Sequence, residues 1–179
     1  FFDVDVIVNI PKLKTHGFTH YSGAVKNLFG AMPGLRKSRM HMKAPAHPEF
    51  AEFLLDLYGA LLYGFEKKKR FLHVMGAVVA MEGEGPGPSG RPKQVGAVLA
   101  SIDGIALDHV AARLVNLDID RILTLTGGFK RGYGVTSAGD IIVKGEDLEK
   151  MWVRDFVPSK NKAFSGIVWP LTSRTIKNA

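Results

Sequence analysis

Residues Asp3–Ile10 read DVDVIVNI, and this stretch decides the fold class. After Asp5 it is rich in β-branched residues and almost continuously apolar, which is typical of a strand buried on both faces of a parallel sheet. Pro11 follows, and we expect the strand to end there. The next residues, 12–21, are predicted to form a loop.

Helices and further strands alternate along the chain from this point. Ser22 is predicted to cap a short helix that closes at Gly30. A long basic loop, residues 31–48, then leads to an amphipathic helix over residues 49–65. Two further buried strands are predicted at residues 71–81 and 95–100, joined by a segment rich in glycine and proline. A second amphipathic helix is expected to start at Asp103 and to reach Leu117.

The remainder of the chain has weaker signals. Residues 121–126 fit either a strand or a short helix, residues 127–134 a flexible basic loop, and residues 140–144 a strand. The last thirty residues are predicted to be irregular, with Trp152, Phe156 and Trp169 as anchors. Strands that alternate with helices predict a three-layer α/β sandwich with a mostly parallel sheet. We expect residues 1–150 to form a ligand-binding core, with residues 151–179 packed on it as an irregular segment.

Composition limits the classes of protein to consider. The chain has 179 residues, of which 46% are hydrophobic and 23% charged, as in ordinary globular domains. It has no cysteine, which excludes disulfides, zinc fingers and cysteine-ligated iron–sulfur clusters within these residues. No apolar run is long enough to cross a membrane, and no secretory leader is visible in these residues, so a cytoplasmic location is the default expectation, the alternative being a leader in a missing N-terminal part. The abrupt start at Phe1 predicts a fragment of a longer protein.

The net charge of +7 comes from one part of the chain. Residues 6–48 contain no Asp or Glu, four of the six histidines, and seven cations: Lys12, Lys14, Lys26, Arg36, Lys37, Arg39 and Lys43. The rest of the chain is electrically neutral. So concentrated a positive field predicts an anionic partner at this stretch.

Within this stretch, residues 11–34 fit the chemistry of an anion site. The first backbone N–H groups of a helix capped by Ser22 would lack partners inside the helix, and Gly23 would let a ligand approach them. Lys26 in the first turn is unfavourable unless an anion lies in front of it. Lys12 and Lys14 follow the first strand, and His16 and Asn27 could add directional hydrogen bonds. The alternative is a solvated basic loop.

Carboxylates near two strand ends are candidates for metal binding or for acid–base catalysis. Asp103 and Asp108 flank the start of the second helix, and Glu82 and Glu84 follow the preceding strand. Asp103 and Asp108, together with His16, are the candidate catalytic residues, and Glu82 and Asp108 are the candidate ligands of a divalent metal. The alternatives are a helix cap for Asp103 and a surface turn for Glu82.

Several of these motifs, in order, carry a resemblance to a known family. They are Asn9–Gly17 (NIPKLKTHG), Ser22–Gly30 (SGAVKNLFG), Met81–Pro86 (MEGEGP), Ala100–Asp103 (ASID) and Asp108–Leu114 (DHVAARL). The chain resembles the bacterial and archaeal domain of unknown function 362. The resemblance implies association with ferredoxin-type iron–sulfur modules, which are often joined to relatives. Where relatives tend to carry an Asp before the Gly-rich loop, this chain has Met75.

Three functions follow as hypotheses. The first is the ligand-binding core of an enzyme that acts on a small anionic metabolite, a phosphate or a carboxylate, with a divalent metal as an optional cofactor. The second is a non-catalytic scaffold of an iron–sulfur protein, whose basic loop docks an acidic electron-transfer partner. Nucleic-acid binding ranks third, because no recognition motif is present and the cations do not form a broad face. Neither nucleic acid nor a membrane is therefore an expected partner.

Overall fold

The computed structural model describes residues 3–34, 36–44 and 46–160. Its strands are β1 (Val6–Asn9), β2 (Lys12–His16), β3 (His20–Ser22), β4 (Arg70–Gly83) and β5 (Gly90–Ser101). Its α-helices are α1 (Ala24–Asn27), α2 (Arg36–Lys43), α3 (His47–Tyr63), α4 (Gly104–Leu114), α5 (Leu123–Arg131) and α6 (Leu148–Met151). Short 3-10 turns cover Leu28–Ala31, Ile119–Arg121 and Ala138–Asp140.

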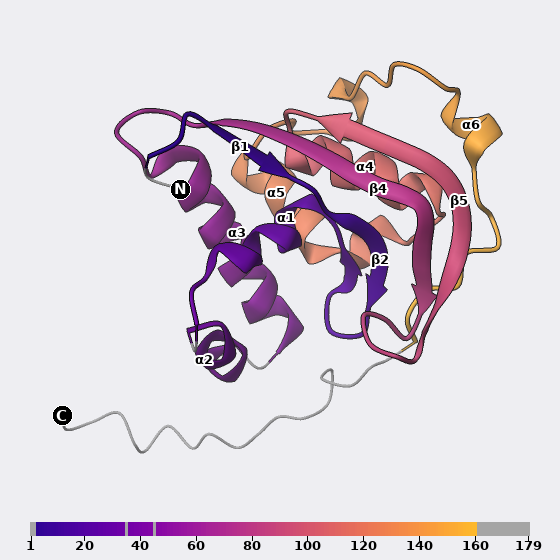
Figure 1. The fold of residues 1–179 in the computed structure, drawn as a ribbon, viewed down its shortest axis with the longest axis horizontal. Helices are drawn as coiled ribbons and strands as arrows, with labels where there is room; N and C mark the ends of the chain where they lie inside the picture. The colour runs from indigo at the N-terminus through magenta and orange to yellow at the C-terminus, as the bar shows by residue number, and fades with distance from the viewer. Residues whose placement is uncertain (1–2, 35, 45, 161–179) are drawn as a thin grey trace.

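Strand β4 is the centre of a five-stranded sheet (Figure 1). β1 and then β2 run parallel to β4 along one of its edges, and Gly76 donates a backbone hydrogen bond of 2.9 Å to the carbonyl of Pro11 between them. β5 lies antiparallel along the other edge, and β3 folds back antiparallel onto β2. Three strands therefore share one direction, and the predicted α/β class is confirmed.

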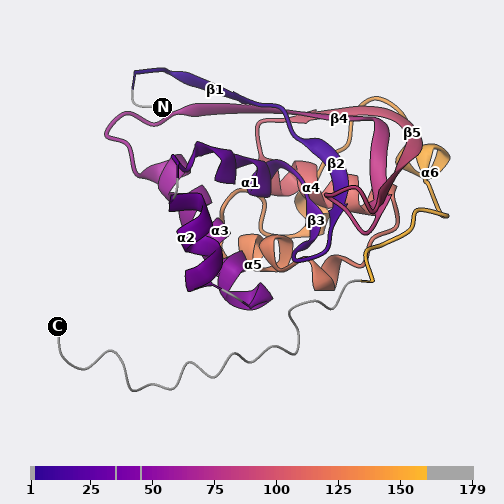
Figure 2. The same ribbon diagram turned by 60° about the horizontal axis from the view of Figure 1, so that its bottom comes forward.

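The helices stack in two layers below the sheet (Figure 2). α1 and α4 lie nearest the strands, and α3 and α5 pack against each other beneath them. The core between these layers contains Leu13, Val25, Met75, Ile105 and Leu125, all at most 1% exposed. Both helical layers thus lie on the same side of the sheet.

The opposite face of the sheet carries exposed apolar side chains. Val6 and Val8 on β1, Val78 on β4 and Val98 on β5 are 44–64% exposed. These residues alternate with buried neighbours such as Ile7 and Ala77, as the pleat of a strand requires. The prediction that residues 3–10 form a strand buried on both faces is therefore wrong. Within the described residues, only one face of β1 is buried.

Two segments predicted as loops are regular instead. Residues 12–21 form the β2–β3 hairpin, in which Leu13 and Thr15 face the core while Lys12 and Lys14 face outward. The outward lysines obscure the strand pattern in the sequence. Within the predicted basic loop, residues 36–43 form α2, and α3 begins at His47.

The C-terminal third also differs from the sequence-based prediction. Residues 127–131 belong to α5, because Gly127 and Gly128 let this helix approach Leu55 and Ile105, which a Cβ would overlap. Residues 141–144 are not paired with any of the described strands. Phe156 is buried in the core, as expected, whereas Trp152 is 41% exposed. Trp169 lies outside the described residues.

Candidate anion site and its surroundings

The start of α1 is capped by a carboxylate from another helix. Ser22 is the last residue of β3, and Gly23 holds the N-cap position without a side-chain hydrogen bond. Asp108 of α4 fills this place: its two oxygens accept hydrogen bonds from the backbone N–H groups of Ala24 (2.5 Å) and Val25 (3.0 Å). The amide end expected to bind an external anion therefore holds an internal one.

Asp108 is also bonded to Tyr21 and is completely enclosed. The hydroxyl of Tyr21 donates to Asp108 Oδ1 at 3.0 Å, and the carboxyl group is 1% exposed. Burial raises the pKa of Asp108 to about 7, while the hydrogen bonds from Val25, Ala24 and Tyr21 act in the opposite direction. Asp108 thus joins α4 to the β3–α1 junction, which is a structural contact.

Three lysines from three elements come near one another beside α1. Lys26 of α1 is partly buried, and its pKa is lowered to about 8, first by burial and then by the charges of Lys14 on β2 and Lys37 on α2. The ammonium group of Lys37 lies 5.3 Å from the centre of the Phe29 ring. We call Lys14, Lys26 and Lys37 the lysine cluster. Lys12 is exposed at the start of β2 and is not among the charges that act on Lys26.

Asn27 is the exposed end of a polar chain that leads to the buried residues Asn9 and His73. Its amide donates to Asn9 Oδ1 at 2.7 Å, and Asn9 Nδ2 lies 2.9 Å from both the carbonyl of Ala24 and His73 Nδ1. His73 is 0% exposed, and its Nε2 has no hydrogen-bond partner among the residues that the structure describes. Sequence reasoning missed Asn9 and His73; the available signal was a polar residue at an inward position of each strand.

The other predicted catalytic residues hold turns and helix ends. His16 Nδ1 accepts backbone hydrogen bonds from Phe18 (3.1 Å) and Thr19 (3.4 Å), which shapes the β2–β3 turn. Asp103 is the N-cap of α4, accepting from Ile105 and Ala106, and its second oxygen accepts from Val135 at 2.7 Å. The capping alternative for Asp103 is thus what the geometry shows.

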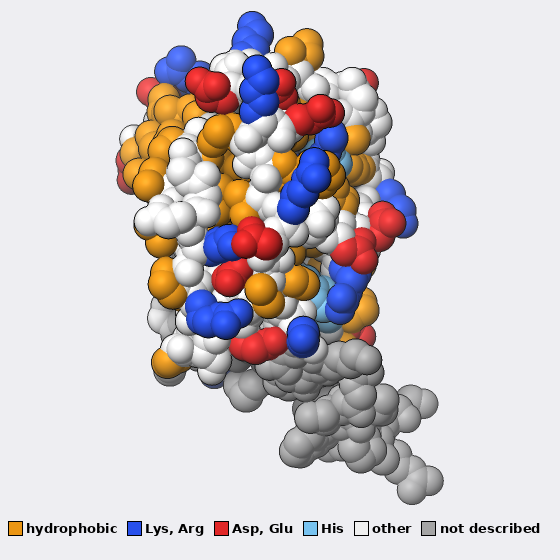
Figure 3. All heavy atoms as spheres, turned by 90° about the vertical axis from the view of Figure 1, so that its right-hand side faces the viewer, with side chains coloured by type: hydrophobic (Ala, Val, Ile, Leu, Met, Phe, Trp, Pro, Cys, Tyr) orange, Lys and Arg blue, Asp and Glu red, His pale blue; other side chains and the backbone are white. Residues whose placement is uncertain are grey.

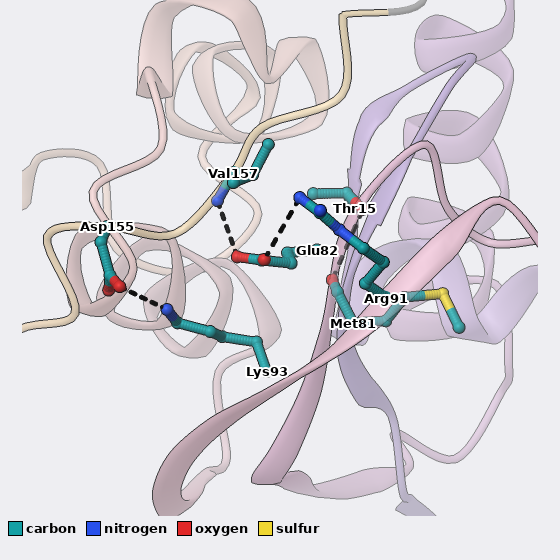
Figure 4. A network of polar contacts seen from close by, with 7 residues as sticks. All are labelled: Thr15, Met81, Glu82, Arg91, Lys93, Asp155 and Val157. Atoms are coloured by element: carbon teal, nitrogen blue, oxygen red, sulfur yellow. Dashed lines mark hydrogen bonds and ion pairs between the residues drawn. The ribbon is translucent and has the colours of Figure 1, made fainter.

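The predicted metal ligands lie in separate networks. Glu82 is 7% exposed, accepts a hydrogen bond of 2.9 Å from the backbone of Val157, and pairs with Arg91 at 3.7 Å (Figure 4). Lys93 and Asp155 pair beside it at 2.6 Å (Figure 4). Across the part of the chain that the structure describes, no three His, Cys, Asp or Glu side chains form a group that could hold a metal ion. Glu82 instead fastens the C-terminal segment to the sheet.

Comparison with known proteins places the chain in a family. The sequence profile of the family described as "Domain of unknown function (DUF362)" matches residues 1–113. The chain belongs to the DUF362 family. It is also 36% identical over 137 residues to the thylakoid-associated protein sll1697 of Synechocystis sp., a match that spans 76% of this chain and 40% of that protein's length. No solved structure matches it.

Met75, where the family resemblance led us to expect an Asp, is a buried apolar residue. Met75 is 0% exposed, and its sulfur lies 3.8 Å from the hydroxyl of Tyr21, next to Asp108. A carboxyl group at this place would lie close to that of Asp108, and two neighbouring carboxylates repel each other. Because Met75 has no charge, no second carboxylate competes with Asp108 for the hydrogen bond that Tyr21 donates.

Gly23 gives a test of this junction in the DUF362 chain. A Cβ at Gly23 would overlap Asp108 Oδ1 and Tyr21 Oη, so Gly23→Ala must displace the capping carboxylate. We expect it to lower the free energy of unfolding by about 2 kcal/mol in urea denaturation. Gly30→Ala is the matched control, because a Cβ there meets no atom of the described residues within 4 Å. Equal effects of the two substitutions would contradict the proposed role of Asp108.

Among the described residues, no helix is both long and apolar enough to span a bilayer.

Proposed function

We propose that this DUF362 chain binds a small anionic metabolite, a phosphate or a carboxylate, at the lysine cluster. The observation that carries the proposal is the position of Lys26. It is partly buried, and the charges that act on it are the two further ammonium groups of Lys14 and Lys37. A bound anion would offset both the mutual repulsion and the loss of solvation.

The distribution of the ion pairs along the chain supports an anion site at the lysine cluster. The described salt bridges use Lys67, Arg91, Lys93 and Arg131, all of which follow the acid-free stretch. Within the described ranges, no carboxylate pairs with a lysine of the cluster. Among the residues that the structure describes, the lysine cluster therefore has no carboxylate as an internal counter-ion.

We place the anion at the lysine side chains of the cluster and not at the backbone amides that begin α1. Asp108 occupies the amides of α1, so Gly23 contributes no ligand contact. Asn27 borders the cluster, with its amide group directed to Asn9. That the chain belongs to an enzyme acting on this anion, with or without a divalent metal, stays a prediction.

The test is isothermal titration of sulfate and of small dicarboxylates into the wild-type chain and Lys26→Met. We expect Lys26→Met to weaken binding at least about tenfold, because the substitution keeps the apolar stem and removes the charge. Lys67→Met is the matched control: Lys67 is 77% exposed and pairs with Asp5 outside the cluster. No binding by the wild type, or equal binding by both variants, would overturn the proposal.

The pH dependence gives a second measurement at the same site. Because the pKa of Lys26 is about 8, Lys26 is charged below this pH and neutral above it. Sulfate keeps its charge throughout, so its affinity is expected to fall by up to about tenfold between pH ~7 and pH ~9. Lys26→Met should show a flatter profile over the same range.

A second candidate function rests on α2. Its cations Arg36, Lys37, Arg39 and Lys43 are all exposed, and its first turn contains no acid. Such a helix fits an acidic protein surface, as a ferredoxin-type electron-transfer partner would offer. Arg36→Glu with Arg39→Glu should abolish salt-dependent binding of an acidic ferredoxin-type protein and leave sulfate binding intact.

We also propose the cytoplasmic location that the sequence leads us to expect. The relative from Synechocystis is named for its association with thylakoids, which makes a membrane fraction the competing location. Cell fractionation with antibody detection distinguishes the two: recovery of the protein with membranes after a salt wash would contradict a cytoplasmic location.

A further inference from the structure

Strand β5 has one edge that is not paired in the sheet. Its pairing runs along β4 from Gly90 to Ser101, and the described strands include no neighbour on its other side. Every second residue of such an edge strand directs its N–H and C=O groups away from the sheet. Exposed edges of this kind recruit further strands unless the protein blocks them.

The first half of this edge is blocked by its sequence. Pro92 lacks an N–H group, and it stands between Arg91 and Lys93, which pair with Glu82 and Asp155. A register shift follows, and Gly96 has a φ of +75°. Proline, charge and irregular backbone are the usual means by which edges avoid pairing.

The second half, Gly96–Ser101, is regularly paired with β4 from Ala97 onward and borders a groove. Its sequence, GAVLAS, contains neither proline nor charge. The groove has a volume of about 490 Å³. The apolar face of α4 forms its inner wall, and residues 140–146, with Leu148 and Met151 of α6, form its outer wall. Figure 1 shows the chain segment before α6 passing outside β5, and Figure 3 shows hydrophobic surface among scattered charges on this side of the molecule.

The outer wall comes close to β5 without pairing with it. Ile141 has extended backbone angles, φ −86° and ψ 116°, and Asp140 is held by Ser137 at 2.9 Å. None of the described backbone hydrogen bonds joins residues 141–145 to β5. The groove therefore separates an open strand edge from a second extended segment.

The geometry points to a binding site for an extended, apolar peptide segment of a partner protein, which adds to β5 as a strand. A row of outward N–H and C=O groups is matched by another extended backbone, whereas a compact ligand meets only one or two of them. Alternate side chains of that strand would contact Ala106, Leu107 and Val110 of α4. With strands about 4.8 Å apart and layers about 10 Å apart, 490 Å³ holds roughly three residues of such a strand.

This site is independent of the lysine cluster. Gly96–Ser101 and α4 carry the groove, while the cluster lies on β2, α1 and α2 across β4. Because Gly96–Ser101 carries no charge, the groove favours a partner whose inserted residues are apolar, whereas the lysine cluster favours an anion. Lys26→Met should therefore leave peptide binding unchanged.

The test uses a fluorescein-labelled octapeptide of alternating valine and threonine. We expect binding in fluorescence anisotropy, together with slower amide hydrogen exchange confined to Gly96–Ser101. The matched control peptide carries N-methyl groups on alternate residues along one edge and should bind at least about tenfold more weakly, because it cannot complete the ladder. Val110→Trp, which fills the groove, should weaken binding of the unmodified peptide similarly.

Three results would overturn the inference. The first is the absence of binding, and the second is equal affinity for the N-methylated peptide. The third is slow exchange at all amides of Gly96–Ser101 in the free protein, which would mean that residues 141–144 or a second copy already occupy the edge. Light scattering identifies the second copy. None of these three results affects the anion-binding proposal.

Discussion

Replacing Asp108 with alanine is expected to lower the free energy of unfolding by about 3 kcal/mol. The substitution leaves three buried donors without their acceptor: the amides of Ala24 and Val25 and the hydroxyl of Tyr21. Each unsatisfied buried donor costs about 1–3 kcal/mol, and relief from burying the carboxyl group offsets part of this sum. Urea denaturation followed by circular dichroism measures the loss.

Two further variants show whether the effect arises from capping. Asp108→Asn keeps one acceptor oxygen but brings an NH₂ group to the amides of α1, so we expect it to recover less than half of the loss. Asp155→Ala removes an exposed partner of Lys93 and should have a much smaller effect. If Asp108→Ala were as mild as Asp155→Ala, the carboxylate would not be what holds α4 to the β3–α1 junction.

Acid is expected to weaken the fold through His73. Burial lowers the pKa of His73 to about 4, from the ordinary histidine value of 6.5, and the charge of Asp103 opposes this shift. Below pH 6.5 the unfolded chain therefore binds a proton that the folded chain excludes, so stability is lost as pH falls and the loss is complete below pH ~4. At pH ~4.5 the linkage amounts to about 2 kcal/mol relative to pH ~7.

The measurement compares wild type with His73→Gln in urea at both pH values. Asp108 has the opposite sign: its raised pKa means that the folded state gains a proton on acidification, which stabilises it. This contribution is common to both proteins and cancels in their difference. His47, whose pKa is also lowered to about 4, cancels in the same way. The wild type should therefore lose about 2 kcal/mol relative to His73→Gln, and an unchanged difference would show that His73 does not carry the acid sensitivity.

Local patterns predicted the strands and helices that have one apolar face and clear ends. Residues 71–81 and 95–100 lie within β4 and β5, and the helix predicted at 49–65 is α3 at 47–63. Asp103 caps α4 because a carboxylate can reach the amides of its own first turn. Such contacts depend on neighbours within a few residues, which is why the sequence shows them.

Segments whose stability comes from distant contacts were predicted poorly. The outward positions of β2 hold Lys12, Lys14 and His16, and it is a strand because Leu13 and Thr15 pack inward beside β4. α5 contains Gly127 and Gly128, which are weak helix formers but let it approach Leu55 and Ile105. Conversely, residues 140–144 have a strand-like sequence and lie unpaired beside the groove.

The sequence by itself determined the α/β class, the family and the concentration of unbalanced positive charge in residues 6–48, because composition, periodicity and motif order are properties of the chain alone. Only the tertiary structure decided which anion meets the start of α1. Asp108 is 84 residues from Ala24, and no local pattern links them. The packing of α4 against α1 places an internal carboxylate there, so the lysines are left as the candidate contacts for an external anion.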